Sequence, residues 1–234
     1  MFTKSARFYD SLYAFKDYAA ASERLRALIE HRVPGARSLL DVGCGTGRHL
    51  ESLARHFEVA GVDIDPGLLA IARQRLPNVP LHEADMSHFD LGRRFDVVTC
   101  LFSAIGYVRT IEKMRKAVAA MARHVEPGGL IVIEPWFTPD SYWTGTITAN
   151  LVDEPDLKIA WMYTSQREDD LSVLDIHYLV GRPTGVRTLH ERQELGLFTE
   201  RQQLDALRDA ALEARHESDT PLGRGLYVAW DSTS

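Results

Sequence analysis

Short, continuously apolar runs alternate with amphipathic stretches over the first 135 residues of the chain. Runs that are apolar at every position, and not at every second one, are typical of strands that helices cover on both faces. The stretches between them carry apolar residues at helical spacing. Strand and helix in regular alternation predict a parallel sheet with right-handed crossovers. The expected strands are 38–42, 59–63, 79–84, 95–101 and 130–134, and the expected helices are 8–31, 49–57, 66–75 and 110–124.

The pattern changes after Pro135. Residues 146–195 divide into several extended segments at the polar turn sequences DEP, EDD and PTG. Such segments predict an antiparallel insertion, which we place at 140–195 within a single domain of residues 1–234. A helix over 200–211 and a final strand over 224–230 follow it. The expected fold class is therefore α/β, a doubly wound and mostly parallel sheet with an antiparallel β insertion after the fifth strand.

The sequence LLDVGCGTGR, residues 39–48, joins the first strand to the next helix through a glycine-rich turn. Ligands bind at the carboxyl ends of the strands in open α/β sheets, and glycine lets them approach the backbone closely. A dinucleotide site requires G-x-G-x-x-G, whereas Gly43, Gly45 and Gly47 have the spacing G-x-G-x-G. Asp41 beside the turn would also repel a phosphate. Because S-adenosylmethionine carries an amine and a sulfonium and no phosphate, the charges favour this methyl donor.

Two further acids follow the next strands. Asp63 ends the second strand, where a carboxylate accepts hydrogen bonds from ribose hydroxyls. Asp85 follows the third strand and can accept from an adenine amino group, while Met86 can lie against the ring. Each acid alone could simply cap a helix, but their order and spacing together predict the cofactor site. Cys44, within the glycine turn, has no local His or Asn motif and is expected to pack beside the cofactor.

Composition and charge exclude several other functions. The net charge of −6 gives no indication of the basic patch that nucleic acids require. The two cysteines lack a C-x-x-C pattern and the histidines lack H-x-x-x-H, so neither a disulfide framework nor a metal site is expected. No apolar stretch approaches the roughly 20 residues of a membrane span, and the first residues do not resemble a signal peptide. We therefore expect a cytoplasmic protein with a small-molecule substrate and neither nucleic acid nor membrane as partner.

The motif residues carry a resemblance to a known superfamily. Asp41 to Gly47, Asp63, Asp85 and the turn VEPGG at 125–129 resemble class I S-adenosylmethionine-dependent methyltransferases. That resemblance covers about residues 36–135 and implies a seven-stranded, Rossmann-like sheet. It specifies the cofactor and leaves the methyl acceptor open.

A narrower resemblance extends along nearly the whole chain. The sequences KDY (16–18), LFSAIGY (101–107), EPWF (134–137) and GRGL (223–226) are similar to those of actinobacterial amino-sugar N,N-dimethyltransferases. Those enzymes methylate a sugar amine on a dTDP-linked deoxysugar for macrolide antibiotics. The resemblance implies N-methylation of a small-molecule sugar substrate and an insertion that helps to form a homodimer.

The resemblance also implies roles for single residues. Tyr107 lies in reach of the reacting amine, and Glu134 could attract or deprotonate it. Tyr9 and Tyr18 could cover the site as a lid, or simply pack as amphipathic rings. The expected catalytic residues are Tyr107 and Glu134; the expected cofactor-binding residues are Tyr18, Asp41, Gly43, Cys44, Gly45, Gly47, Asp63, Ile64, Asp85, Met86, Leu101 and Phe102; and the expected substrate-binding residues are Tyr9, Ser103, Trp136 and Arg224.

Arg224 carries the expectation of a nucleotide-linked substrate. A guanidinium flanked by two glycines can reach a diphosphate without crowding and bind it through two hydrogen bonds. Alternatively, Arg224 only closes a turn before the final strand.

Three departures from the sugar enzymes bear on the acceptor. That family usually has alanine at Gly43, glutamate at Asp63 and a second tryptophan at Phe137, and residues 140–170 diverge as well. A methyltransferase of another small-molecule amine or of a hydroxyl is therefore an alternative. A protein that binds the cofactor without turnover is a further one, although the intact motif acids argue against it. The glycine spacing disfavours an NAD-dependent dehydrogenase.

Overall fold

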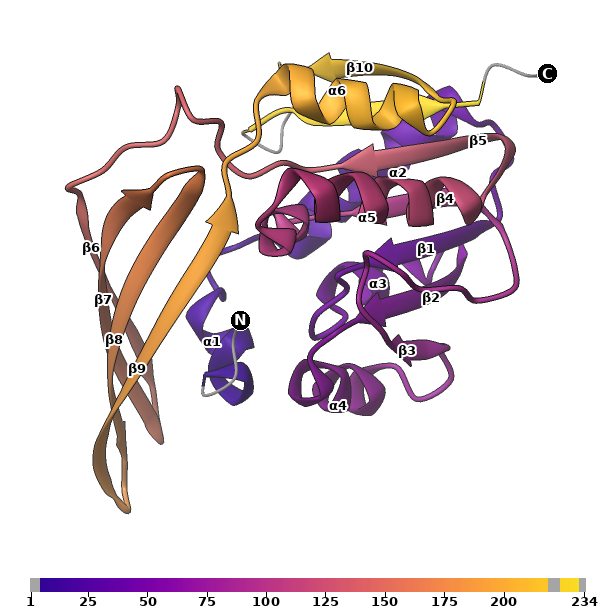
Figure 1. The fold of residues 1–234 in the computed structure, drawn as a ribbon. Coiled ribbons are helices and arrows are strands. Elements are labelled where there is room, and N and C mark those ends of the chain that lie inside the picture. Colours follow the sequence, from indigo (N-terminus) through magenta and orange to yellow (C-terminus); the bar gives the residue numbers. More distant parts are fainter. Residues whose placement is uncertain (1–4, 219–223, 232–234) are drawn as a thin grey trace.

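A computed structural model of the chain describes residues 5–218 and 224–231. Its main sheet has seven strands in the order β10-β11-β5-β4-β1-β2-β3 (Figure 1). These strands are β1 (Ser38–Val42), β2 (Glu58–Asp63), β3 (Leu81–Glu83), β4 (Phe95–Cys100), β5 (Val125–Ile133), β10 (Glu213–Glu217) and β11 (Leu226–Trp230). The first five run parallel, and β11 runs antiparallel to its neighbours β5 and β10. The strand order reverses between β1 and β4, where a ligand crevice is expected.

Helices cover both faces of this sheet, as the apolar strands predict. They are α2 (Tyr18–Arg32), α3 (Arg48–Leu53), α4 (Pro66–Arg75), α5 (Ile111–Arg123) and α6 (Glu200–Asp209). Successive strand residues point to opposite faces, so Leu39 packs with α2, α3 and α4 while Leu40 packs with α5 and α6. Among the described residues, no helix is both long and apolar enough to span a membrane.

The predicted insertion forms a second sheet beside the first (Figure 1). Its strands are β6 (Ile147–Glu154), β7 (Leu157–Glu168), β8 (Leu171–Arg182) and β9 (Gly185–Gly196), all antiparallel to their neighbours. Alternate residues of β7 and β8, among them Ile159, Trp161, Ile176 and Tyr178, are buried on its inner face. The opposite, outer face remains exposed.

The N-terminal segment lies between the two sheets (Figure 1). It contains a 3₁₀ turn, η1 (Ala6–Phe8), and a single-turn helix, α1 (Tyr9–Leu12). Ser5 donates from its backbone N–H and its hydroxyl to the carboxylate of Glu191 on β9, at 2.9 and 2.5 Å. On the other side, Asp10 accepts a hydrogen bond of 2.7 Å from Thr46 in the glycine-rich turn. The segment therefore connects the insertion to the end of β1.

Three sequence expectations need correction. The helix expected over 8–31 is interrupted, because Asp17 caps a new helix by accepting the Ala20 N–H at 2.8 Å. The strand expected over 79–84 is confined to Leu81–Glu83, while the strand expected over 130–134 already begins at Val125. β10 was not expected at all, because its sequence EARHE has little apolar pattern. The remaining elements lie where the sequence places them, within a few residues at their ends.

Candidate active site

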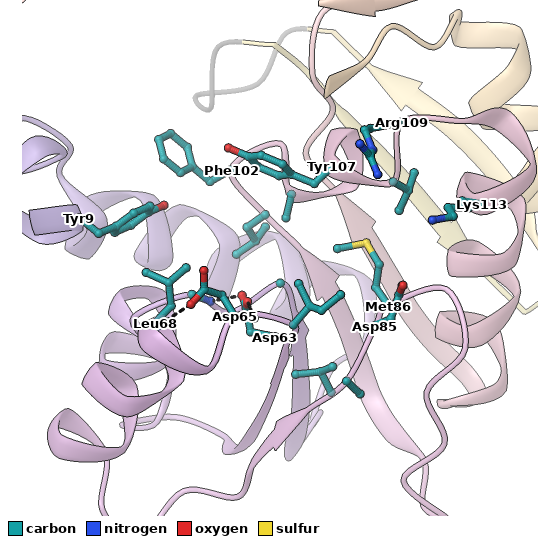
Figure 2. A pocket seen from close by; sticks show the side chains of 18 residues that line it. Tyr9, Asp63, Asp65, Leu68, Asp85, Met86, Phe102, Tyr107, Arg109 and Lys113 are labelled. Atoms are coloured by element: carbon teal, nitrogen blue, oxygen red, sulfur yellow. Dashed lines mark hydrogen bonds between the residues drawn. The ribbon is translucent and has the colours of Figure 1, made fainter. Parts of the chain in front are cut away.

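A pocket lies at the carboxyl ends of β1, β2, β3 and β4, next to the reversal of strand order (Figure 2). Its position agrees with the general rule for open α/β sheets. The predicted site residues that line it are Tyr9, Gly43, Gly45, Asp63, Ile64, Asp85, Met86, Leu101, Phe102 and Tyr107.

Asp63 ties the glycine-rich turn to the end of β2. Its Oδ2 accepts the Gly45 N–H at 2.7 Å, and its Oδ1 accepts the Asp65 N–H at 2.8 Å. Burial raises the pKa of the Asp63 carboxyl, and these two hydrogen bonds partly offset that effect. Gly45 has a φ of +55°, and a Cβ there would meet no atom within 4 Å. The turn therefore leaves open space in which a ligand can approach the backbone.

Asp85 and Met86 lie side by side in the part of the pocket that follows β3 (Figure 2). Asp85 accepts two hydrogen bonds of 2.8 Å from Ser87, one from its N–H and one from its hydroxyl. Partial burial raises the pKa of Asp85, but the bonds from Ser87 outweigh it, so the net pKa is lowered. The carboxylate is thus an ionised acceptor beside a soft, apolar thioether, a pair suited to an adenine ring and its amino group.

The turn after β4 has a strained backbone. Phe102 and Ser103 have φ values of 49° and 61°, a region that non-glycine residues rarely adopt. The Phe102 N–H donates to the carboxylate of Glu134 at 2.7 Å, and the Ser103 hydroxyl donates to the Pro135 carbonyl at 2.7 Å. Glu134 is buried behind this turn and is not part of the pocket lining. Its predicted catalytic role stays a prediction, whereas its contact holds the turn in place.

Tyr107 projects into the pocket from a short helix, η2 (Ala104–Val108), which follows that turn (Figure 2). Its hydroxyl donates to Oε1 of Gln193 on β9 at 3.1 Å. Burial, and to a lesser degree Tyr178 and Glu191, raise the pKa of Tyr107. The phenol therefore stays protonated at neutral pH and cannot act as an acceptor of a proton in its resting state.

Several predicted cofactor residues lie behind the glycine-rich turn and do not line the pocket. Asp41 is buried and accepts a hydrogen bond of 2.8 Å from Thr99, and burial raises its pKa to about 7. Cys44 is a free thiol in the core, and burial raises its pKa. Gly47 is the N-cap of α3, and a Cβ added at Gly47 would lie 3.0 Å from the Leu76 side chain. These residues shape the turn from behind.

Arg224 contacts two of the other predicted substrate residues, Ser103 and Trp136. Its guanidinium lies 4.7 Å from the ring centroids of both Trp136 and Phe137, and it donates to the Ser103 hydroxyl at 3.0 Å. The Trp136 indole donates in turn to Ser172 of β8 at 2.7 Å. This aromatic and cationic cluster joins the turn after β4 to the insertion. Gly223 of the sequence GRGL lies outside the described residues.

Several residues that line the pocket were not predicted from the sequence. Tyr18, which was predicted, stands in the first turn of α2 with its ring 6.5 Å from that of Phe102 and is not part of the lining. Asp65 was missed although an Asp directly before a proline is a recognisable helix cap: its Oδ1 accepts the N–H groups of Gly67 and Leu68. The other missed lining residues are Val62, Leu68, Ala84, Ala104, Val108, Arg109 and Lys113.

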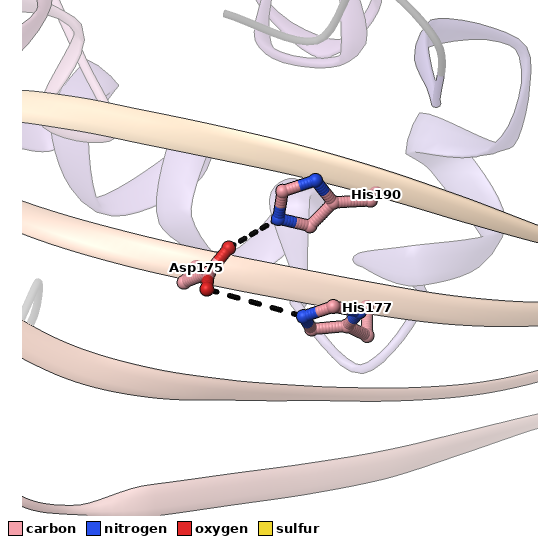
Figure 3. Close-up of side chains that lie close together, drawn as sticks. All are labelled: Asp175, His177 and His190. Carbon is pink, nitrogen blue, oxygen red and sulfur yellow. Dashed lines mark hydrogen bonds and ion pairs between the residues drawn. The ribbon is translucent and has the colours of Figure 1, made fainter.

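A separate polar group occupies the outer face of the insertion sheet. Asp175 accepts a hydrogen bond from His190 and lies 3.9 Å from His177, and the two imidazole rings stack at 4.6 Å (Figure 3). Their possible ligand atoms lie within 4.8 Å of one another, so this group has the geometry to ligate a metal ion. This group could not be predicted from the sequence, because the cross-strand register, and not spacing along the chain, pairs His177 with His190.

Comparison with known proteins decides the family. Residues 39–129 match the family described as "Methyltransferase domain". A dTDP-4-amino-2,3,4,6-tetradeoxy-D-glucose N,N-dimethyltransferase of Saccharopolyspora spinosa is 40% identical over 226 residues, which cover 95% of this chain and 91% of that enzyme. The chain belongs to the dTDP-amino-sugar N,N-dimethyltransferase family. It is an enzyme that uses S-adenosylmethionine as its cofactor.

Two solved structures support the assignment of the chain to this family of methyltransferases. The crystal structure of DesVI from Streptomyces venezuelae gives a TM-score of 0.93 at 38% identity and covers 97% of this chain and 98% of that chain. CalS10, an amino pentose methyltransferase from Micromonospora echinaspora determined with S-adenosylmethionine bound, gives 0.87 at 39% identity, covering 94% and 95%.

The pocket of the methyltransferase fits this cofactor. The open face of Gly45 leaves room for a ligand at the backbone, and the carboxylate of Asp63 at the end of β2 has the chemistry that ribose hydroxyls require. Asp85 and Met86 after β3 have the chemistry that suits an adenine ring; their contacts to the cofactor stay predictions. Both acids already accept backbone N–H groups, but a carboxylate has about four acceptor positions and can accept further hydrogen bonds.

We expect Asp63→Ala to weaken binding of S-adenosylhomocysteine by about 1–3 kcal/mol, because hydrogen bonds to the ribose are lost and the Gly45 turn loses its anchor. Asp63→Glu should retain most of the affinity, since it keeps the carboxylate. Isothermal titration calorimetry measures both, with Asp156→Ala in the β6–β7 turn as the matched control. Equal affinity of Asp63→Ala and the wild type would contradict the assignment.

Proposed function

We propose that this methyltransferase transfers methyl groups from S-adenosylmethionine to the amine of a dTDP-linked amino deoxysugar. The observation that carries the proposal is the extent of the likeness. It continues beyond residues 39–129 through the insertion to nearly the whole chain. The Saccharopolyspora spinosa relative is named for a dTDP-4-amino sugar, and a Streptomyces venezuelae relative, 39% identical over 224 residues, is named for a dTDP-3-amino sugar. Since CalS10 is described as involved in calicheamicin biosynthesis, we propose that the reaction belongs to the biosynthesis of an antibiotic. We also propose, from the sequence alone, that it takes place in the cytoplasm.

The chemistry around the pocket supports a sugar nucleotide. On the inner face of the insertion, Trp161 stacks on Tyr163 and Tyr178, with ring centroids 5.6 and 6.1 Å apart, and packs against the N-terminal segment beside the pocket. Arg224, whose planar guanidinium can bind a diphosphate through two hydrogen bonds, lies on the same side of the pocket, next to Trp136.

The residues of the chain would act mainly by positioning. The bound cofactor supplies an electrophilic methyl group on a sulfonium, which is already a good leaving group. The strained turn of Phe102 and Ser103 and the ring of Tyr107 fix the wall of the pocket that faces the acceptor. Alignment of the nucleophile and exclusion of water are then the main contributions to the rate. Because Tyr107 stays protonated, the amine must arrive without its proton or lose it to water or to Glu134, whose catalytic role stays a prediction.

We expect Tyr107→Phe to lower kcat by less than about 10-fold, because its raised pKa makes the phenol a positioning group and not a base. Steady-state kinetics with the sugar nucleotide measure the effect. Gln193→Leu, which removes the hydrogen-bond partner of the phenol, should have an effect of similar size. A fall in kcat of about 10²-fold or more for Tyr107→Phe would make Tyr107 the general base instead.

The substrate assignment is tested by mass spectrometry. The enzyme is incubated with S-adenosylmethionine and with dTDP-3-amino or dTDP-4-amino deoxysugars, and we expect a gain of one or two methyl groups on nitrogen. The same amino sugars without the nucleotide should react far more slowly if Arg224 binds the diphosphate. Methylation of a free amine or a phenol while neither sugar nucleotide gains mass would reject the sugar and keep the methyltransferase. No product with any acceptor would favour a protein that binds the cofactor without turnover.

We also propose a homodimer formed through the outer face of the insertion. The strand register places five large apolar side chains on that face, and each is between 49% and 71% exposed. They are Ile147, Leu151, Met162, Leu179 and Val186. Exposed apolar surface of this extent on an antiparallel sheet is typical of an interface, and symmetric pairing is the common arrangement.

We expect light scattering to report a dimer at micromolar concentration. The double substitution Leu151→Glu and Leu179→Glu should give a folded monomer, because burying two carboxylates in the interface costs more than the contact stabilises. Phe15→Glu, which changes another exposed apolar residue, is the control and should remain dimeric. A monomeric wild type at high micromolar concentration would reject the dimer.

A further inference from the structure

Lys16 occupies an unusual place for a lysine. It lies between α1 and α2 and extends over the turn after β4, where its Nζ is 3.5 Å from the centroid of the Phe102 ring. The ammonium is buried and has no hydrogen-bond partner among the residues that the structure describes. The sequence assigned it no role of its own. Because a buried, unpaired charge is costly, its retention here requires a reason.

The surroundings of Lys16 provide weak compensation only. Its pKa is lowered to about 8, chiefly by burial; the charge of Arg224 also lowers it, while the charges of Glu134 and Asp41 partly oppose the shift. Neither acid forms an ion pair with Nζ within the described part of the chain. Both are committed elsewhere: Glu134 accepts from Phe102 and Asp41 accepts from Thr99. The position therefore has a cation beside an electron-rich ring, and the described residues supply no anion in contact with it.

The order of the strands indicates which part of the cofactor reaches Lys16. The adenine site, Asp85, follows β3, and the ribose site, Asp63, ends β2. The sheet continues from β2 to β1 and then to β4. A cofactor laid along the ends of these strands must therefore direct its amino-acid end toward β1 and β4. Lys16 lies there, over Phe102 after β4 and within electrostatic reach of Asp41 on β1.

We propose that the ammonium of Lys16 binds the carboxylate of the methionine moiety of S-adenosylmethionine. The cofactor then supplies the anion that the position lacks, and a charge-assisted hydrogen bond forms in a site shielded from water. Because Lys16 follows α1, which is hydrogen-bonded to the glycine-rich turn through Asp10 and Thr46, this contact also fastens the N-terminal segment over the pocket. Cofactor binding and closure of that segment are coupled through one side chain.

The test compares two ligands and two variants by isothermal titration calorimetry. One ligand is S-adenosylhomocysteine; the other is its decarboxylated form, which keeps the amine and lacks only the carboxylate. We expect Lys16→Met to weaken S-adenosylhomocysteine about 10- to 100-fold and to change the decarboxylated ligand by less than about 2-fold. Lys16→Arg, which keeps the charge, should recover most of the affinity. The wild type should prefer the carboxylated ligand by a similar factor.

Each other outcome overturns the proposal. Equal weakening of both ligands by Lys16→Met would show that Lys16 only shapes the pocket. Unchanged affinity for both would show that the carboxylate binds elsewhere. If Lys16→Met leaves both ligands unaffected but weakens binding of dTDP, then Lys16 serves the nucleotide of the acceptor. Should Lys16→Met fail to fold, the wild-type comparison and Lys16→Arg still decide, because no preference for the carboxylated ligand would exclude any cation at that end of the pocket.

Discussion

Backbone N–H groups at the carboxyl ends of the parallel strands must find partners once the strands end, and here the carboxylates of two buried acids and one half-buried acid provide them. Asp63 accepts from Gly45 and Asp65, Asp85 accepts from Ser87, and Glu134 accepts from Phe102. Hydrogen bonds to a charged acceptor stabilise more than neutral ones, by about 1.5–3 kcal/mol each. The shape of the pocket depends on these contacts, since they fix the glycine-rich turn and hold the Phe102 turn in its strained backbone conformation.

Two of these acids, Asp63 and Asp85, also line the pocket, so their free acceptor positions are open to a ligand. A carboxylate oriented by a backbone N–H presents its remaining acceptor positions in a fixed direction, which suits a ligand with several hydroxyl and amino groups. Preorganisation of this kind reduces the entropy lost on binding. It also means that replacing Asp63 removes a ligand contact and a structural contact together, so the loss of affinity combines both effects.

The insertion and the N-terminal segment complete the pocket from outside the main sheet. Ser5 is hydrogen-bonded to Glu191 of β9, while Asp10 is hydrogen-bonded to Thr46 in the glycine-rich turn. Tyr107 reaches across to Gln193 on the same strand. Three regions far apart in the sequence therefore meet around the site where methyl transfer would occur.

The sequence by itself determined the doubly wound sheet, the insertion and the cofactor motif, because these depend on local pattern: apolar runs at Ser38–Val42 and Phe95–Cys100, and glycines at fixed spacing after a strand. Even the helix cap at Asp17 could have been predicted from its residue type, but the continuous helical spacing obscured it.

Tertiary structure alone decided what has no local pattern. β10 is a polar edge strand defined by its pairing with β11, and Asp41 is separated from the pocket by the turn that follows it. Glu134 is directed toward the Phe102 N–H and not into the pocket. The Lys16 ammonium is buried without a hydrogen-bond partner among the described residues. Patterns along the chain report which face of an element is buried, whereas the charge and hydrogen-bonding state of a buried group depend on neighbours that only the folded chain brings together.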